Sequence, residues 1–127
     1  MNGKEEYTLN PNTTTSVTIE AEDGQRIICS IYNLTDEAIL YKDAYVDSIS
    51  VYARNTYDVV FPCGITFDTP ASEALKLLGE PTKSYDSDYP SYTWRESDQA
   101  YCAKLELCAK KADDTITSVT ITGNLYN

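Results

Sequence analysis

Two short strand-forming segments on either side of an Asp-Gly turn constrain the fold of this chain more than any other feature. Apolar and polar residues alternate over residues 16–20, and a β-branched run resumes over residues 26–32. Asp23-Gly24 between them favours the tight turn of a β-hairpin. A period of two residues sends alternate side chains to opposite sides of a strand, whereas a helix repeats every 3.6 residues. We therefore predict an antiparallel hairpin in a strand-dominated chain.

Further strands are predicted along the rest of the sequence. Residues 45–53 and 57–61 are rich in Val, Ile and Tyr, and residues 115–122 contain Val119 and Ile121. A strand begins at Tyr92-Thr93-Trp94, and residues 101–108 alternate with Leu105 and Leu107 on one face. Residues 82–91, with several Ser and Asp and with Pro90, indicate a surface loop.

One helix is predicted, over residues 70–78. Thr69 stands at the expected N-cap, Pro70 at the first helical position, and Gly79 and Pro81 end the segment. Helical spacing gathers an apolar stripe on one side of it. The stripe consists of Ala71, Ala74, Leu75 and Leu78. So short a helix must pack on the sheet to be stable.

These elements predict the α/β class in its α+β form, an antiparallel sheet with one short helix packed on it. With 127 residues, 42% hydrophobic and 24% charged, the chain has the size and composition of one globular domain. We predict a single domain over residues 1–127. Residues 7–61 form its strand-rich half, and residues 64–123 form a module of helix and antiparallel sheet.

The charge and the apolar pattern limit the partners. Ten Lys and Arg against twenty Asp and Glu give a formal charge of −10, which repels nucleic acid. No stretch approaches the ~18 apolar residues that a membrane-spanning helix needs, so we predict no direct membrane insertion. Residues 1–6 lack the basic start and apolar run of a signal peptide. A leader or lipid anchor upstream of the given sequence stays open.

The four cysteines show no close Cys-x-x-Cys pair of the kind that holds zinc. Cys102 and Cys108 lie in one predicted strand, where six residues at ~3.3 Å each separate them by roughly 20 Å. That span is far beyond disulfide reach, so we predict that they do not pair with each other. A bridge involving Cys29 or Cys63 and a set of four free thiols both remain open.

The absence of histidine argues against an enzyme, since it removes the usual general base and the commonest metal ligand. Asp86 with Asp88 and Asp113 with Asp114 are the nearest carboxylate pairs, but each lies in a polar turn, whereas a catalytic acid needs burial. Residues 86–88 also lack the Gly and distal Glu of a calcium loop. We predict no catalytic residue, no metal site and no cofactor.

The candidate binding residues are aromatic. Eleven tyrosines stand against two phenylalanines, and four aromatic residues gather beside the loop of residues 82–91. They are Tyr85, Tyr89, Tyr92 and Trp94. Tyrosine suits surfaces that are partly packed and partly wet, as recognition surfaces are. The alternative is that Tyr92 and Trp94, two apart on one strand, are both sheet residues and that one of them packs against the helix.

Several phrases carry a family resemblance over residues 64–123. They are Gly64-Ile65-Thr66, Leu78-Gly79-Glu80-Pro81, Tyr92-Thr93-Trp94 and the closing strand from Ile116 to Ile121. This region resembles the helix-then-sheet module of β-lactamase-inhibitor-protein-like (BLIP-like) domains and of small outer-membrane lipoproteins of the SmpA/OmlA type. The strand-rich half resembles the leading region of uncharacterised envelope lipoproteins from Gram-positive gut bacteria.

The resemblance implies a setting and a role rather than an activity. Those inhibitors contain two tandem modules and this chain contains one, so inhibition of a β-lactamase is not carried over. What is implied is an extracytoplasmic protein, at the cell envelope or secreted, with a non-enzymatic role in protein interaction or assembly and an unidentified protein partner. The alternative is a small acidic inhibitor or immunity-type protein that masks a basic site on an enzyme. If the given N-terminus is native, the setting would be cytoplasmic.

Overall fold

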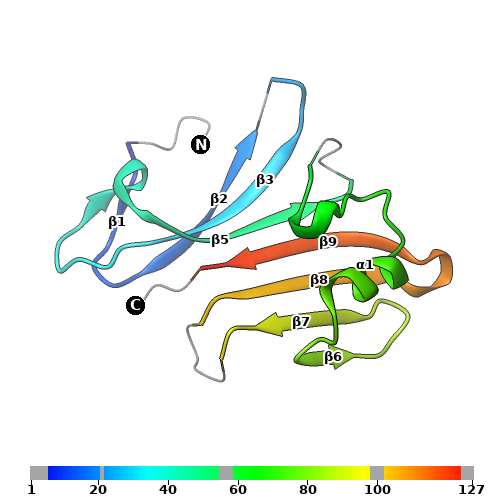
Figure 1. Cartoon of the computed structure of the whole chain (residues 1–127). Helices are drawn as coiled ribbons and strands as arrows, with labels where there is room; N and C mark the ends of the chain where they lie inside the picture. Colours follow the sequence, from blue (N-terminus) through cyan, green and yellow to red (C-terminus); the bar gives the residue numbers. More distant parts are fainter. Residues whose placement is uncertain (1–5, 21, 55–58, 98–101, 124–127) are drawn as a thin grey trace.

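The computed structural model describes residues 6–20, 22–54, 59–97 and 102–123. Within them it contains nine strands, one α-helix and three single-turn 3₁₀ helices (Figure 1). In the first half these are β1 (Thr8–Leu9), β2 (Thr14–Glu20), β3 (Arg26–Tyr32), β4 (Ile39–Leu40), η1 (Tyr41–Asp43), β5 (Tyr45–Tyr52) and η2 (Pro62–Gly64). Then come α1 (Ala71–Leu78), β6 (Lys83–Tyr85), β7 (Ser91–Arg95), β8 (Lys104–Lys110), η3 (Lys111–Asp113) and β9 (Thr115–Thr122).

One antiparallel sheet runs through both halves of the chain. Its seven strands follow the order β2-β3-β5-β9-β8-β7-β6, and β1 pairs with β4 in a separate two-stranded sheet. The predicted α+β class, an antiparallel sheet with one short helix, is confirmed. The hairpin of β2 and β3 forms as predicted, and β5 of the first half pairs with β9 at the end of the chain. The last strand therefore joins the two halves through backbone hydrogen bonds.

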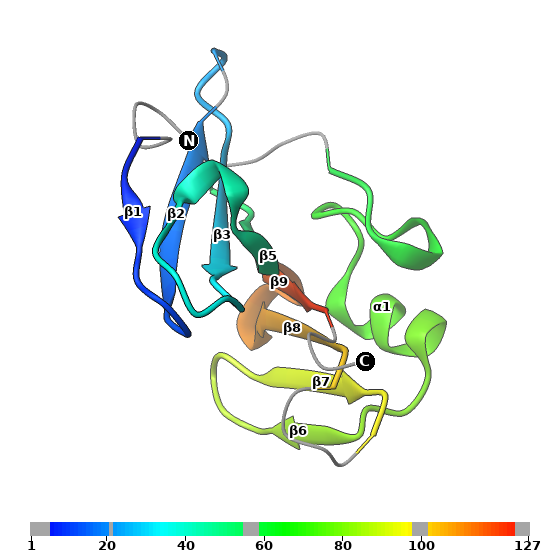
Figure 2. The same ribbon diagram turned by 90° about the vertical axis from the view of Figure 1, so that its left-hand side faces the viewer.

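The buried residues lie on one side of this sheet, which we call the covered face. Directly paired residues of antiparallel strands project to the same side. Val17 pairs with Cys29, and Val51 pairs with Val119. The first pair packs with Leu9 of β1, and the second packs with α1 and Phe61. Figure 2 shows β1 and α1 as two separate covers over a strongly twisted sheet.

The helix begins one residue later than predicted, and its predicted cap is wrong. Pro70 precedes the first helical residue, Ala71. The Thr69 hydroxyl instead accepts a hydrogen bond from the backbone N–H of Thr66 at 3.0 Å, in the turn before the helix. The predicted end is confirmed, because Gly79 takes a φ of 82° that favours glycine. Of the apolar stripe, the two alanines are buried and the two leucines are only half-buried.

Three other expectations are corrected by the described residues. Residues 59–61 are not a strand, and residues 57–58 lie outside the described part of the chain. The expected loop of residues 82–91 contains β6, which pairs with β7. All three residues of β6 are exposed, so no alternation of apolar residues marks it in the sequence. The strand predicted over 101–108 begins only at Lys104; Tyr101 lies outside the described residues.

Candidate functional site

The four candidate aromatic residues do not form one patch. Tyr92 and Trp94 lie on the covered face of β7, whereas Tyr85 pairs with Ser91 and therefore projects to the other side of the sheet. Tyr89 lies in the turn between β6 and β7. Tyr85 and Tyr89 are 67% and 65% exposed. Only these two are freely accessible.

Trp94 attaches the end of the helix to the sheet. Its indole Nε1–H donates a hydrogen bond to the carbonyl of Gly79 at 3.1 Å. The ring also packs against the core that contains Leu107 and Val119. A helix leaves its last carbonyls without intrahelical partners, and this indole satisfies the carbonyl that directly follows α1. Trp94 thus has a structural role, which is the alternative considered for it from the sequence.

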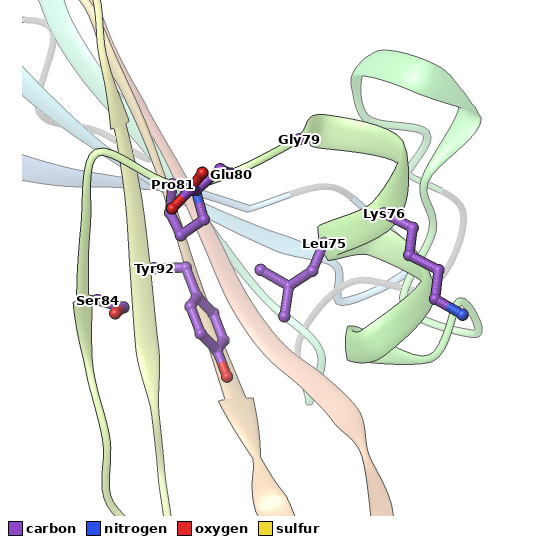
Figure 3. Close-up of a pocket in the computed structure, with 7 residues that line it drawn as sticks. All are labelled: Leu75, Lys76, Gly79, Glu80, Pro81, Ser84 and Tyr92. Atoms are coloured by element: carbon purple, nitrogen blue, oxygen red, sulfur yellow. The ribbon is translucent and has the colours of Figure 1, made fainter.

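Tyr92 forms one wall of a pocket between α1 and the hairpin of β6 and β7. The pocket has a volume of about 360 Å³. Figure 3 shows Leu75 projecting from the helix towards the Tyr92 ring, while Lys76 points away. Pro81 also lines this open pocket, and most of the lining is apolar. The pocket fits an apolar side chain and presents no converging set of acid, base and nucleophile.

The side of the sheet opposite the helix carries no cover in the described structure, and we call it the open face. Its residues alternate with the core residues along each strand, and none of them is buried. On β2, β3 and β5 they are Thr14, Ser16, Thr18, Glu20, Arg26, Ile28, Ser30, Tyr32, Tyr45, Ser48, Ser50 and Tyr52. On β6 to β9 they are Lys83, Tyr85, Ser91, Thr93, Arg95, Lys104, Glu106, Cys108, Ser118, Thr120 and Thr122.

Hydroxyl groups line the centre of the open face. Ser16, Ser30, Ser48 and Thr122 stand side by side across four neighbouring strands. In the next row the hydroxyls of Ser50 and Thr120 are hydrogen-bonded at 2.9 Å. Short β-branched and hydroxyl side chains keep the surface polar without long flexible groups. Little side-chain entropy would be lost if another protein covered it.

The open face is basic although the chain is acidic. It carries Arg26, Lys83, Arg95 and Lys104 but only two acids, Glu20 and Glu106. Arg95 and Lys104 are direct cross-strand partners beside the row of hydroxyls. Because the whole chain has a formal charge of −10, its excess acids lie elsewhere. The charge carried by this face therefore differs in sign from the net charge of the chain.

Three of the four carboxylates considered from the sequence make contacts within the chain. Asp86 forms an exposed ion pair with Lys111 at 3.2 Å. Asp113 accepts a hydrogen bond from the Thr115 hydroxyl at 2.8 Å, and Asp114 contacts the first turn of the helix. Within the described ranges no three Cys, Asp or Glu side chains come together as a metal site.

The cysteines differ in their surroundings, and all four are free thiols in the structure. Cys29 is buried under β1, and this burial raises the pKa of its thiol. Cys102 is also buried, but hydrogen bonds with Arg95 and with the backbone of Ser97 lower its pKa. Cys63 is exposed, and Cys108 lies on the open face.

No family model, curated protein or solved structure matches this chain. No described helix has the length and apolar character needed to cross a membrane.

The open face was missed from the sequence, although a signal for it was present. Thr14, Ser16 and Thr18 alternate with covered-face residues on β2, and Ser118, Thr120 and Thr122 do so on β9. Each run taken alone indicates only a strand with one wet side. The strand order, which the sequence did not predict, brings these runs onto one surface.

Proposed function

We propose that this chain is a non-enzymatic protein-interaction or assembly module that works outside the cytoplasm, at the cell envelope or after secretion, and that it holds its protein partner on the open face. The observation that carries the proposal is that exposed tyrosines and an excess of cations share the open face, although they are spread over several strands. Tyr45 and Tyr85, on this side, are 57% and 67% exposed.

The chemistry of this surface is that of recognition. Tyrosine and arginine are enriched among the residues that contribute most to protein–protein binding. Tyrosine offers a large contact area with few rotatable bonds. A partner with an acidic or hydroxyl-rich surface would complement Lys83, Arg95 and Lys104. The resemblance of residues 64–123 to BLIP-like and SmpA/OmlA-type modules supports the same role and setting.

Charge reversal at matched positions tests the proposal. In one variant Lys83→Glu and Lys104→Glu reverse two exposed cations of the open face. In the control, Lys42→Glu on η1 and Lys76→Glu on α1 make the same change in net charge away from this face. Partner capture from an envelope extract of the source cells should fall for the first variant and persist for the control.

The alternative function predicts a different result. An acidic inhibitor that masks a basic site would bind its target more strongly when lysines become glutamates. Equal loss of capture in both variants would show that the open face is not the binding surface. Circular dichroism of each variant checks that the sheet is intact.

A further inference from the structure

The two edges of the seven-stranded sheet are built differently. β6, at one edge, has three residues and carries Lys83, so it is short and charged. β2, at the other edge, has seven residues with the sequence Thr-Thr-Ser-Val-Thr-Ile-Glu. It contains no proline, no lysine and no shift in its register with β3. Short strands, lysine, proline and bulges are the devices that keep edges from pairing, and β2 has none of them.

The hydrogen bonds at the start of β2 show which of its backbone groups are free to pair. The backbone N–H of Asn33 donates to the carbonyl of Thr13 at 3.0 Å, and Thr14 lies opposite Tyr32. Thr14 and Tyr32 are therefore a non-hydrogen-bonded pair, and such pairs alternate along an antiparallel ladder. The N–H and C=O groups of the even-numbered residues point to the open edge. These residues are Thr14, Ser16, Thr18 and Glu20.

We propose that β2 is a homodimer interface, at which the β2 strands of two copies of this chain pair antiparallel about Val17. This register places Ser16 opposite Thr18 of the second copy and Thr14 opposite Glu20. All four outward-pointing residues then exchange backbone hydrogen bonds. Val17 meets its own counterpart, so each strand keeps its covered and open sides aligned with those of its partner. The two sheets become one continuous sheet.

Charge favours the antiparallel over the parallel orientation of the two copies. The turn that follows β2 carries Glu22 and Asp23, whereas residues 10–13 before it are uncharged. Antiparallel pairing sets each acidic turn beside the uncharged segment of the other copy, and parallel pairing would bring the two acidic turns together. Glu20 is already paired with Arg26 of its own chain at 3.3 Å. No two residues of like charge therefore face each other among the seven paired positions of β2.

The dimer should be weak and dependent on concentration. One strand pair buries less area than a standard protein interface, and each copy has a formal charge of −10. Added salt screens this repulsion and should strengthen the association. The dimer would also extend the open face across both copies, because the open sides of the two sheets become continuous.

Sedimentation over a series of protein concentrations tests the proposal with two variants. Ser16→Lys with Thr18→Lys sets lysines opposite each other across the interface and should abolish the dimer. Ser16→Lys with Thr18→Glu sets each lysine opposite a glutamate and should retain it. Both positions are exposed on the open face, so the monomer fold should tolerate either pair. A parent chain that stays monomeric at every concentration, or a double-lysine variant that still dimerises, overturns the proposal.

Amide hydrogen exchange provides a readout within the same strand. Exchange at Ser16 and Thr18 should slow as the protein concentration rises, because their N–H groups bond the second copy. Exchange at Val17 and Ile19 should not depend on concentration in this way, because their N–H groups bond β3. Equal dependence at all four positions contradicts the register. Binding of an unrelated extended peptide by a monomeric parent chain would replace the second copy with a heterologous strand and also overturn the proposal.

Discussion

Asp114 caps the N-terminus of the helix from across the sequence: its carboxylate accepts hydrogen bonds from both the backbone N–H and the hydroxyl of Ser72, at 3.0 and 2.5 Å. The carbonyl of Asp114 also accepts from the N–H of Ala71 at 2.8 Å. The first N–H groups of a helix have no intrahelical partners, and a side-chain oxygen usually comes from the residue just before it. Here the turn between β8 and β9 supplies it.

Replacing Asp114 should destabilise the whole domain. Asp114→Ala removes the cap and puts alanine at a φ of 55°, where Asp and Asn are tolerated better. We expect the free energy of unfolding to fall by about 1–2 kcal/mol, the usual cost of a lost cap. Asp114→Asn keeps an acceptor oxygen and the left-handed preference, so it should cost less than half as much. Chemical denaturation of the three proteins measures this, and equal losses in the two variants would contradict the capping role.

Leu107 and Ile121 lie on the same face of the sheet but should differ in their contribution to stability. Leu107 is 1% exposed, and Ile121 is 42% exposed between the two covers. Leu107→Ala should lower the free energy of unfolding by about 2–5 kcal/mol, the range for a buried leucine. Ile121→Ala should cost about 1 kcal/mol or less, because its side chain remains partly in water. Similar losses from the two substitutions would be inconsistent with the described packing.

Tyr85 and Tyr89 should matter for binding and not for folding. Because both side chains are mostly exposed, replacing both with Ser should change the free energy of unfolding by no more than about 0.5 kcal/mol. Partner capture should be lost if they anchor a partner, as predicted from the sequence. Trp94→Phe is the contrasting variant, since it removes the hydrogen bond to Gly79 and should destabilise the fold by about 1 kcal/mol. Full capture by the folded double-Ser variant would remove these tyrosines from the binding surface.

The thiols should react with an alkylating reagent in the order of their accessibility. Cys63 is exposed and should react first under native conditions. Cys29 should react last, because it is buried and its raised pKa leaves less thiolate at any given pH. Cys102 is 4% exposed, so its lowered pKa should speed the reaction only after local opening. Mass spectrometry of the alkylated peptides gives the order.

Peptide mapping without reductant tests the predicted absence of a Cys102–Cys108 bond. The prediction assumed that both cysteines lie in one strand. In the structure Cys102 precedes β8, and only Cys108 lies in the strand. The structure still places them in different surroundings, with Cys102 buried beside Ser97 and Cys108 on the open face. Recovery of a linked pair would require β8 to be broken.

The sequence by itself determined the local structure wherever one short segment carries its own physical signal. The hairpin of β2 and β3 follows from the alternation before Asp23-Gly24 and the β-branched run after it. The end of the helix follows from Gly79, whose φ of 82° favours glycine. The α+β class follows from these elements together. Each signal depends on interactions between residues a few positions apart, so it can be read without knowing the rest of the fold.

Only the tertiary structure decided which distant segments meet. The cap on Ser72 comes from Asp114, and β6 forms because β7 pairs with it, although its own residues are all exposed. The open face and the free edge of β2 likewise depend on the strand order. Backbone hydrogen bonds between strands are nearly independent of side-chain identity, so the sequence of a strand says little about its neighbour. Burial of the covered face selects among the possible orders, and burial is a property of the whole chain.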